Sequence, residues 1–392
     1  MCSRSVRNLK FQKIKETRDM KKLFIIFLAV LICSSQLSAQ RHEKKVLVLL
    51  PFHVENSGRS ETIKNESDIY SNKSYEMFGF WEGAQLALEP YNKDYVKIKV
   101  IVRDVNTNEE KLQSILDELK DEQIDLIIGP LFGKPFALAA EYAKEHHIPI
   151  VNPFSNRSDF LEDNPYVYKL IPSLEPRPQT LDKLLLSKLD NYNLIFWTNE
   201  NSKTKDQPYY EIYFTNKGIE YKTVALNSGF QDLKKAFEKN KKNVIVALFD
   251  NASVAIIQQL QNLALLADTS ITLVAPESWL DIKNVGYNYL NQLNFHFFTN
   301  YFIDKNDPAV KLFADEYITK FSSYPDVTRF SYQGYDITSY FISLLINNFD
   351  FSKVDTKPLS FEFDFDNEKG NGYENRHQRL IRMEDFQLKE VK

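Results

Sequence analysis

The stretch DLIIGPLFGKPFALAAEYAKEHHIPIVNPFS, residues 125–155, decides the fold of this chain. Residues 125–129 form a short apolar run that ends at a glycine and a proline, which is typical of a buried strand. Small and apolar residues then recur at helical spacing and predict a helix with a small-residue face (Phe136, Ala139, Ala140 and Ala143). Residues 148–153 predict the next strand. A strand, a helix and a strand in this order indicate a right-handed parallel crossover.

Two polar or glycine-containing loops, residues 130–134 and 154–158, follow the two strands. Parallel sheets bind ligands at the carboxyl ends of their strands, so we expect both loops at a ligand-binding edge. Phe132 and Phe154 come directly after the strands and are candidates for lining a cleft. Lys134 lies at the predicted helix start, where free amide groups favour an anion, although a solvated lysine is an equal alternative.

Residues 1–39 are predicted to be an N-terminal extension followed by a secretory signal peptide, whose three parts lie within residues 20–39. Residues 20–22 are the basic part, residues 23–33 are the apolar part, and Ala39 is the small residue before the cleavage site. The apolar part is about half as long as the ~20 residues that a membrane-spanning helix needs. We therefore predict a start at Met20, cleavage after Ala39 and no membrane span in the exported chain. A lipid anchor at Cys33 is the alternative.

The composition after Ala39 excludes several classes of function. Cys2 and Cys33 both precede the cleavage site, so the exported chain has no disulfide, no thiolate nucleophile and no cysteine metal site. The remaining 353 residues carry 41 Lys and Arg against 51 Asp and Glu, a net charge of −10. An acidic surface argues against nucleic acid or an anionic membrane as a partner. A chain of this length corresponds to about two domains.

A second α/β series follows the proline-containing segment 173–179, which is predicted to be a linker. Its apolar runs alternate with helical patterns and predict strands at 193–198, 221–226, 243–250, 271–275 and 295–302. The first series also contains strands at 45–52 and 97–102, and a long polar stretch at 53–73 that indicates a functional loop or an insertion. The sequence therefore predicts two α/β lobes, each with a ligand-binding edge.

Candidate ligand-binding residues also follow the strands of the second series. Asp250 and Asn251 end a strand, where they either bind polar groups of a ligand or cap the next helix. Trp279 follows the strand at 271–275 and is a third aromatic candidate for lining the cleft.

Patterns for catalysis are absent from the sequence. The chain has no G-x-S-x-G elbow, no H-E-x-x-H and no G-x-G-x-x-G after a strand. Residues 129–134 are one residue short of a phosphate-binding loop, and the adjacent His146 and His147 point too far apart on a helix to chelate one ion. We predict a protein that binds without catalysing a reaction and needs no metal or cofactor.

Five blocks in order resemble one known family. Residues 127–155 contain the pattern IGP, alanines, IP and Ser, preceded by FGFWEGAQLALEPYN at 78–92 and VKIKVIVRDVN at 96–106. Residues 300–345 contain a Phe, a Tyr, a Phe, a Pro and a Tyr-Asp pair in this order, and residues 372–376 are GYENR. These blocks resemble the type I periplasmic binding proteins, the family of the branched-chain amino-acid receptors.

The resemblance implies an α/β fold with two Rossmann-like lobes, each a mostly parallel sheet flanked by helices. Three hinge crossovers would join the lobes, near residues 173–178, 299–305 and 348–358. The first lobe would be residues 40–173 and 303–350, and the second lobe residues 174–302 and 351–392. Ligand binding would close the lobes by hinge motion.

The resemblance also implies roles for individual residues. The family's loop after IGP usually offers hydroxyl groups to the carboxylate of an amino acid, whereas residues 131–135 contain no hydroxyl group. Ser155 and Asn156 retain the polar loop after the next strand. Tyr209 lies near the family's aromatic residue of the second lobe, and Glu277 matches the acid that often pairs with the ligand's amine. The amine half of an amino-acid site is therefore better preserved than the carboxylate half.

We expect an exported binding protein that captures a small polar ligand in an interlobe cleft, for uptake by an ABC permease or for sensing through an envelope receptor. The alternative is an envelope module of the same fold that regulates or scaffolds cell-wall machinery through protein contacts. The missing hydroxyl groups and the 53–73 stretch motivate this alternative.

Overall fold

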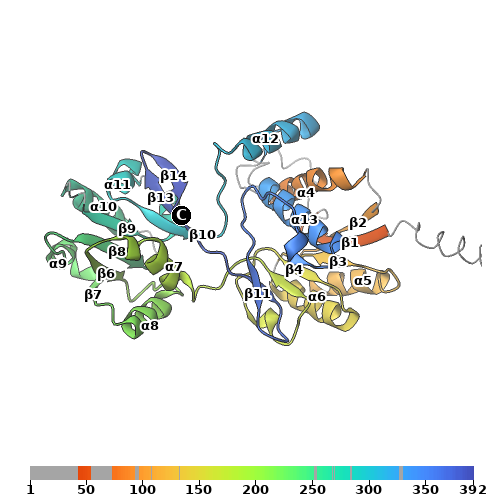
Figure 1. The fold of residues 1–392 in the computed structure, drawn as a ribbon, viewed down its shortest axis with the longest axis horizontal. Helices are drawn as coiled ribbons and strands as arrows, with labels where there is room; N and C mark the ends of the chain where they lie inside the picture. Colours follow the sequence, from red (N-terminus) through yellow and green to blue (C-terminus); the bar gives the residue numbers. More distant parts are fainter. Residues whose placement is uncertain are drawn as a thin grey trace, which may run out of the picture. The chain divides into compact units, whose positions relative to one another are not determined.

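The computed structural model describes residues 43–53, 73–92, 97–106, 108–131, 133–250, 254–266, 268, 270–282, 285–325 and 330–392. The predicted leader, nearly all of the 53–73 stretch, Phe132 and Asn251 lie outside the described residues. Among the described residues, no helix combines the length and the hydropathy that crossing a membrane requires. The described residues form two seven-stranded sheets (Figure 1).

The first sheet has the strand order β11-β12-β5-β4-β3-β1-β2. Its strands are β1 (Glu43–Leu50), β2 (Lys97–Asp104), β3 (Leu126–Ile128), β4 (Ile150–Asn152), β5 (Val167–Lys169), β11 (Phe365–Asn367) and β12 (Tyr373–Asn375). Strands β1, β3, β4, β5 and β12 pair in parallel, and β11 pairs with β12 in antiparallel orientation. The helices of this lobe are α4 (Lys73–Leu88), α5 (Glu109–Glu118), α6 (Gly133–His146), α12 (Pro308–Phe321), α13 (Phe330–Ile346) and the 3-10 turns η2 (Glu89–Asn92), η3 (Asp159–Leu161) and η7 (Phe351–Lys353).

Helix packing in the first lobe depends on small residues. The predicted small-residue face of α6 is buried, and Phe136, Ala139 and Ala143 have no exposed surface. Helices α4 and α13 lie side by side (Figure 1). Their backbones approach so closely that an added Cβ on Gly83 would lie 1.9 Å from the carbonyl oxygen of Ser331. Glycine is therefore required at this contact.

The second sheet has the strand order β14-β13-β10-β9-β8-β6-β7. Its strands are β6 (Tyr192–Thr198), β7 (Tyr221–Ala225), β8 (Lys242–Leu248), β9 (Ile271–Val274), β10 (His296–Thr299), β13 (Arg379–Glu384) and β14 (Gln387–Glu390). Strands β6 to β10 pair in parallel, and the last two add an antiparallel hairpin. Helices α7 (Arg177–Leu184), α8 (Gln207–Lys217), α9 (Phe230–Lys235), α10 (Val254–Leu265) and α11 (Tyr287–Gln292), with the 3-10 turns η4 (Leu186–Lys188), η5 (Leu226–Ser228) and η6 (Glu277–Asp281), complete this lobe.

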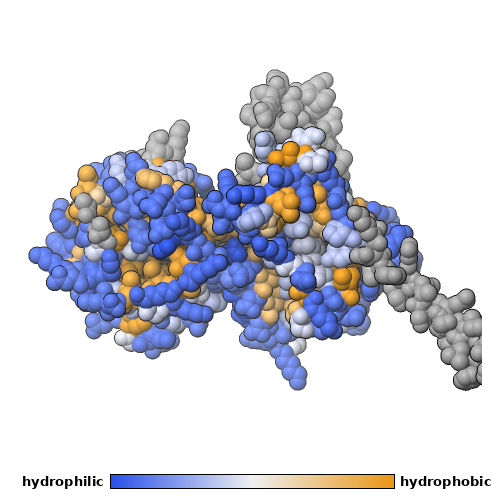
Figure 2. All heavy atoms as spheres, turned by 45° about the horizontal axis from the view of Figure 1, so that its top comes forward, coloured by the Kyte–Doolittle hydropathy of each residue, from blue (hydrophilic) through white to orange (hydrophobic). Residues whose placement is uncertain are grey.

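Both faces of the second sheet are buried, which explains its continuous apolar strands. Successive side chains of β6 point to opposite faces. Phe196 packs in a core with Tyr210 and Phe214 of α8, whereas Trp197 packs in a separate core with Phe249 and Trp279. The outer surface shown in Figure 2 is mostly hydrophilic, and its apolar residues form separate patches.

The third crossing between the sheets differs from the expectation. The family resemblance implies a crossing at 348–358 and a second lobe that includes residues 351–392, but β11 and β12 belong to the first sheet. The chain therefore leaves the first sheet after Asn375 and enters the second at Arg379. The physical reason is aromatic packing, because the ring of Tyr373 stacks on Tyr168 of β5 with centroids 4.8 Å apart.

Candidate functional site

A cavity of about 310 Å³ lies at the carboxyl edge of the second sheet. The ends of β8, β9 and β10 form its floor, and the residues that precede α7 and α8 form its sides. Parallel sheets place ligands at this edge, since the loops there are free to carry polar side chains. The polar side chains around the cavity include Arg177, Thr204, Lys205, Asp206, Asp250 and Glu277.

An ion pair lies on one side of the cavity. Arg177 is the first residue of α7, and its Nη1 donates to Oδ2 of Asp206 over 2.9 Å. Asp206 precedes α8 and is only 6% exposed. The guanidinium also lies over the ring of Phe298, 5.5 Å from its centroid, in a cation–π contact. The ion pair and this contact hold the arginine at the cavity wall.

Two further carboxylates come from the loops after β8 and β9. Asp250 follows β8, and Glu277 begins η6 after β9. Burial and, second to it, the charge of Asp206 raise the pKa of Asp250, while Arg177 and Lys205 oppose this shift. Because burial and Asp206 both disfavour the ionised form of this carboxyl group, a cation that comes close to it stabilises that form.

Two polar atoms at the cavity have no hydrogen-bond partner among the described residues. They are Nε of Arg177 and the hydroxyl Oγ1 of Thr204, and both atoms are buried. A hydrogen bond from the Thr204 backbone N–H to the carbonyl of Leu248, 3.1 Å, holds Thr204 at the end of β8. Buried polar groups without partners are uncommon and mark places where a ligand can bind.

The structure brings together some of the predicted residues of the second lobe. Asp250 and Glu277 both line the cavity, and Asn251 lies outside the described residues. Tyr209 does not line it; its neighbour Tyr210 does, and the hydroxyl of Tyr209 instead bonds to Glu175, which raises the pKa of Tyr209.

The prediction for Trp279 is wrong. Its side chain has no exposed surface and packs against Trp197 and Phe249, with ring centroids 6.2 and 5.5 Å away. Within the η6 turn, Glu277 faces the cavity and Trp279, two residues later, enters the core. A single turn thus separates a polar wall residue from a core residue.

The predicted residues of the first lobe are not gathered in one pocket. Phe154 is half-buried and packs edge-on against Phe80 and Phe330, with centroids 6.2 and 5.6 Å away. The Oγ of Ser155 accepts from the backbone N–H of Arg157, and Asn156 is exposed. Phe132 is outside the described residues.

Lys134 lies elsewhere in the first lobe. It lines a surface groove with Glu109, Glu141 and Arg157, formed by the starts of α5 and α6 and by the loop after β4. This groove is a different pocket from the cavity of the second lobe.

Arg177, Thr204 and Asp206 were missed from the sequence. Arg177 lies in the segment predicted as a linker, and Asp206 pairs with it across 29 residues, a separation at which no local pattern is visible. The only signal is their position at helix starts of the second α/β series: Arg177 is the first residue of α7, and Asp206 directly precedes α8.

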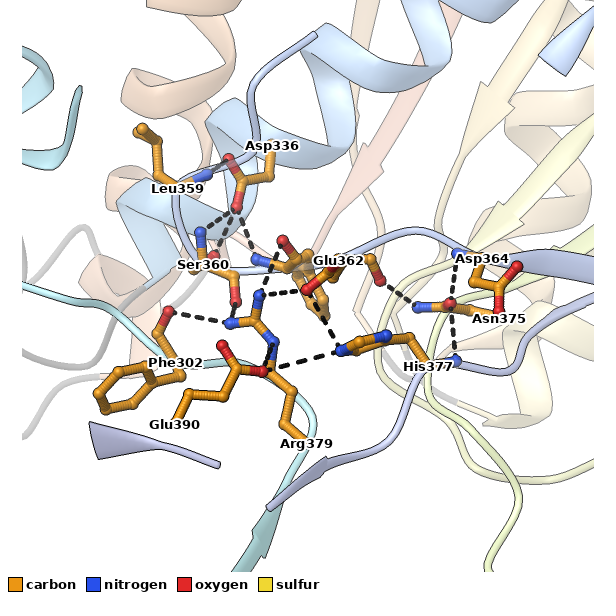
Figure 3. Close-up of polar contacts among 11 residues, drawn as sticks. Phe302, Asp336, Leu359, Ser360, Glu362, Asp364, Asn375, His377, Arg379 and Glu390 are labelled. Atoms are coloured by element: carbon orange, nitrogen blue, oxygen red, sulfur yellow. Dashed lines mark hydrogen bonds and ion pairs between the residues drawn. The ribbon is translucent and has the colours of Figure 1, made fainter. Parts of the chain in front are cut away.

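One cluster outside the cavity has the residue types of a metal site. Potential ligand atoms of Glu362, His377 and Glu390 lie within 4.8 Å of one another (Figure 3). However, the guanidinium of Arg379 already pairs with both carboxylates, 3.3 Å from Glu362 and 3.4 Å from Glu390, and donates to the carbonyl of Ser360 over 2.9 Å. Because a protein cation already lies between the two acids and pairs with both, we describe this cluster as an ion-pair network.

A family model for periplasmic binding proteins matches residues 73–347. No curated protein matches the chain. The structure of an ABC transporter substrate-binding protein from Desulfitobacterium hafniense in complex with Leu is 15% identical with a TM-score of 0.53, covering 89% of this chain and 100% of that chain.

Two further solved structures share the fold. A branched-chain amino acid ABC transporter periplasmic ligand-binding protein from Burkholderia xenovorans LB400 is 13% identical with a TM-score of 0.57, covering 89% of this chain and 94% of that chain. An ABC transporter substrate-binding protein from Sphaerobacter thermophilus is 13% identical with a TM-score of 0.51, covering 89% of this chain and 96% of that chain. At these identities the likeness concerns the fold, and the predicted two-lobed α/β fold is confirmed.

Proposed function

The chain belongs to the periplasmic binding protein family, and we propose that it is an exported, non-catalytic protein that captures a small polar ligand. The observation that carries this proposal is the cavity at the carboxyl edge of the second sheet, which is lined by charged side chains and by two residues with a buried polar atom that has no hydrogen-bond partner within the described part of the chain. Its volume of about 310 Å³ is at the lower end of the range for ligand pockets, which suits a small molecule.

We propose that the ligand is passed to an ABC permease or reported to an envelope receptor. The predicted leader would take the chain to the periplasm, and the fold is shared with ABC transporter substrate-binding proteins, one of them solved in complex with Leu. Closure of the two lobes about their three crossings would then separate the loaded form from the empty form.

A second candidate is a protein-contact module of the envelope. The observation that favours it is the packing of Phe154 against Phe80 and Phe330, which turns a predicted lining side chain toward its own lobe. In this role the lobes would present a surface to cell-wall machinery, and no small molecule would be needed.

A thermal-shift screen of residues 40–392 distinguishes the two candidates. The compounds are amino acids, small peptides, nucleotides, sugars and cell-wall fragments. A ligand at 100 times its dissociation constant stabilises the folded chain by about 2.7 kcal/mol, which raises the melting temperature by a few degrees. A hit that Glu277→Gln weakens supports the binding protein, whereas no shift from any compound supports the protein-contact module.

A further inference from the structure

The positive charges of the second lobe are concentrated at the amino edge of its sheet, opposite the candidate cavity. Residues 217–242 carry seven lysines, no arginine and three acids, a net charge of +4, which leaves −14 for the rest of an exported chain whose total is −10. We propose that this edge docks on the headgroups of an anionic phospholipid bilayer. The inference goes beyond the proposed function, because it requires no ligand in the cavity.

The topology of the chain brings the lysines together. In a parallel α/β sheet each helix ends where the next strand begins, so helix C-termini and strand starts share the amino edge. Lys217 lies in the last turn of α8, and Lys234 and Lys235 end α9. Lys239 lies in the connection to β8, and Lys242 is the first residue of that strand. All five side chains are exposed, and we call them the basic edge.

The acids at this edge do not cancel the positive charge. The carboxylate of Glu238 is shared by Lys222 and Lys241, 2.7 and 2.6 Å from their ammonium groups, and Asp232 pairs with Lys235 over 2.7 Å. The connections before β6 and β9 and the hairpin turn after β13 add four more charged residues, which lower the sum to +2 (Lys188, Asp190, Asp268 and Asp385).

The helix dipole accounts for part of the pattern only. Cations are favourable in the last turn of a helix, which explains the lysines that end α8 and α9. Lys239 and Lys242 lie outside the helices, so the dipole does not explain them. An attraction to an anionic partner explains all five residues of the basic edge.

Two exposed apolar side chains project from the same edge. Leu265 is the last residue of α10, which precedes β9, and it is 79% exposed. Arg382 of β13 lies opposite His296, the first residue of β10, so the turn that follows β13 lies beyond the amino end of β10. Phe386 in this turn is 62% exposed. Lysines combined with exposed apolar side chains are typical of surfaces that bind to a membrane interface.

The backbone at Phe386 is unfavourable for a phenylalanine. Asp385 and Phe386 have φ values of 52° and 62°, in the left-handed region, where hairpin turns prefer Asn and Gly. The backbone N–H of Phe386 donates to Oδ1 of Asn291 over 2.9 Å, which holds the turn against α11. The exposed ring gains little from packing in the chain itself, whereas burial in a bilayer interface would compensate for the strained backbone.

A lipid surface fits this edge better than an acidic protein does. The seven cations between residues 217 and 242 are all lysines, which act as point charges, whereas arginine is enriched where protein interfaces form bidentate ion pairs. The starts and ends of several elements carry the lysines, so they are spread along the sheet edge and do not surround one pocket. The predicted leader would take the chain to the envelope, where bilayer surfaces are available.

The test measures co-sedimentation of the exported chain with two kinds of vesicle. One kind is pure phosphatidylcholine, and the other contains phosphatidylglycerol and phosphatidylcholine in equal parts. We expect binding to the anionic vesicles alone, and a decrease of this binding as the salt concentration rises. Equal binding to both vesicles, or binding to neither, would overturn the inference. A chain that ignores both vesicles but binds poly-L-glutamate would point to an acidic protein and would overturn it too.

A pair of lysine substitutions locates the surface. Each lysine near an anionic bilayer contributes about fivefold to the affinity, so Lys234→Gln combined with Lys239→Gln is expected to weaken vesicle binding about 25-fold. The matched control combines Lys305→Gln with Lys311→Gln, which removes the same charge from exposed positions at α12 and just before it. Its affinity is expected to stay within about twofold of the wild type. Equal losses in the two double variants would show a dependence on net charge alone and would overturn the docking edge.

Phe386→Asn separates docking from folding. The substitution is expected to weaken vesicle binding about tenfold and to raise the urea midpoint, because asparagine tolerates the left-handed backbone better than phenylalanine does. Leu312→Gln, which changes an exposed side chain of α12, is the control and is expected to leave vesicle binding unchanged. Wild-type vesicle binding in both Phe386→Asn and the Lys234 and Lys239 double variant would overturn the inference. The proposed function would still stand, because none of these residues lines the cavity.

Discussion

The ammonium of Lys169 lies 2.6 Å from the carboxylate of Glu374, and both side chains are buried, 0% and 6% exposed. This ion pair joins β5 to β12 at the edge of the first sheet. Lys169 also donates to the hydroxyl of Ser173 over 2.8 Å, and Glu374 accepts from the backbone N–H of Ser173 over 2.7 Å. The ion pair therefore connects Ser173, where the first crossing between the two sheets begins, to β12, the strand from which the last crossing begins.

Replacing Glu374 by Gln is expected to destabilise the fold strongly. The substitution leaves the Lys169 ammonium buried without a counter-charge, and removing one partner of a buried pair costs about 3–5 kcal/mol. Urea unfolding measures the difference. The control is Lys235→Gln, which removes an exposed pair with Asp232 and is expected to cost at most about 1 kcal/mol. A Glu374→Gln chain as stable as this control would contradict the prediction.

Gly334→Ala is expected to destabilise the first lobe by about 1–3 kcal/mol, since overpacking forces the backbone to move. An added Cβ would lie 2.0 Å from the carbonyl oxygen of Phe80, so α4 and α13 must separate. Thermal and urea unfolding report the change. Gly133→Ala is the matched control, because its nearest neighbour is the flexible end of Arg157 at 3.4 Å. Equal stability of the two variants would show that the helices do not pack this closely.

His296 is expected to make stability depend on pH. Burial is the main cause that lowers its pKa to about 4, against an ordinary value of 6.5. Between these values the unfolded chain binds a proton that the folded chain does not, so the free energy of unfolding falls as the pH falls from 6.5 to 4. The linked change is roughly 3 kcal/mol.

The measurement compares urea unfolding of the wild type and His296→Phe at several pH values. The comparison is needed because burial raises the pKa of Asp336 to about 6, which changes stability in the opposite direction over part of this window. Asp336 is common to both chains and cancels in the difference. Parallel stability curves for the two chains would mean that His296 titrates normally in the fold.

How much of the fold could be predicted from the sequence depends on how far apart in the sequence the interacting residues lie. The α6 face and the strands β1 to β4 and β6 to β10 were predictable, because a run of neighbouring apolar residues shows that a segment is buried, as in Phe196 and Trp197. The position of the third crossing could not be predicted in this way, because it depends on the ring of Tyr373 stacking on Tyr168, which lies far away in the sequence.

The same reasoning applies to the candidate site. Position after a strand identified Asp250 and Glu277 as edge residues, but it also suggested Trp279, because the direction of a side chain depends on the turn that carries it. Arg177 and Asp206 become a pair only when α7 and α8 pack together. No spacing rule connects them in the sequence.

Glu277 and Lys134 were both candidates from the sequence, and the structure predicts different outcomes for them. Glu277→Gln removes a charge from the wall of the second-lobe cavity, so it is expected to weaken binding of the tightest ligand from the thermal-shift screen about tenfold, since hydrogen bonds to charged groups contribute about 1.5–3 kcal/mol. Lys134→Ala changes a surface groove of the first lobe, so the affinity is expected to stay within twofold of the wild type. Calorimetric titration of both variants with that same ligand makes the comparison. A loss in Lys134→Ala with none in Glu277→Gln would move the binding site to the first lobe, because each substitution removes one charge from one pocket only.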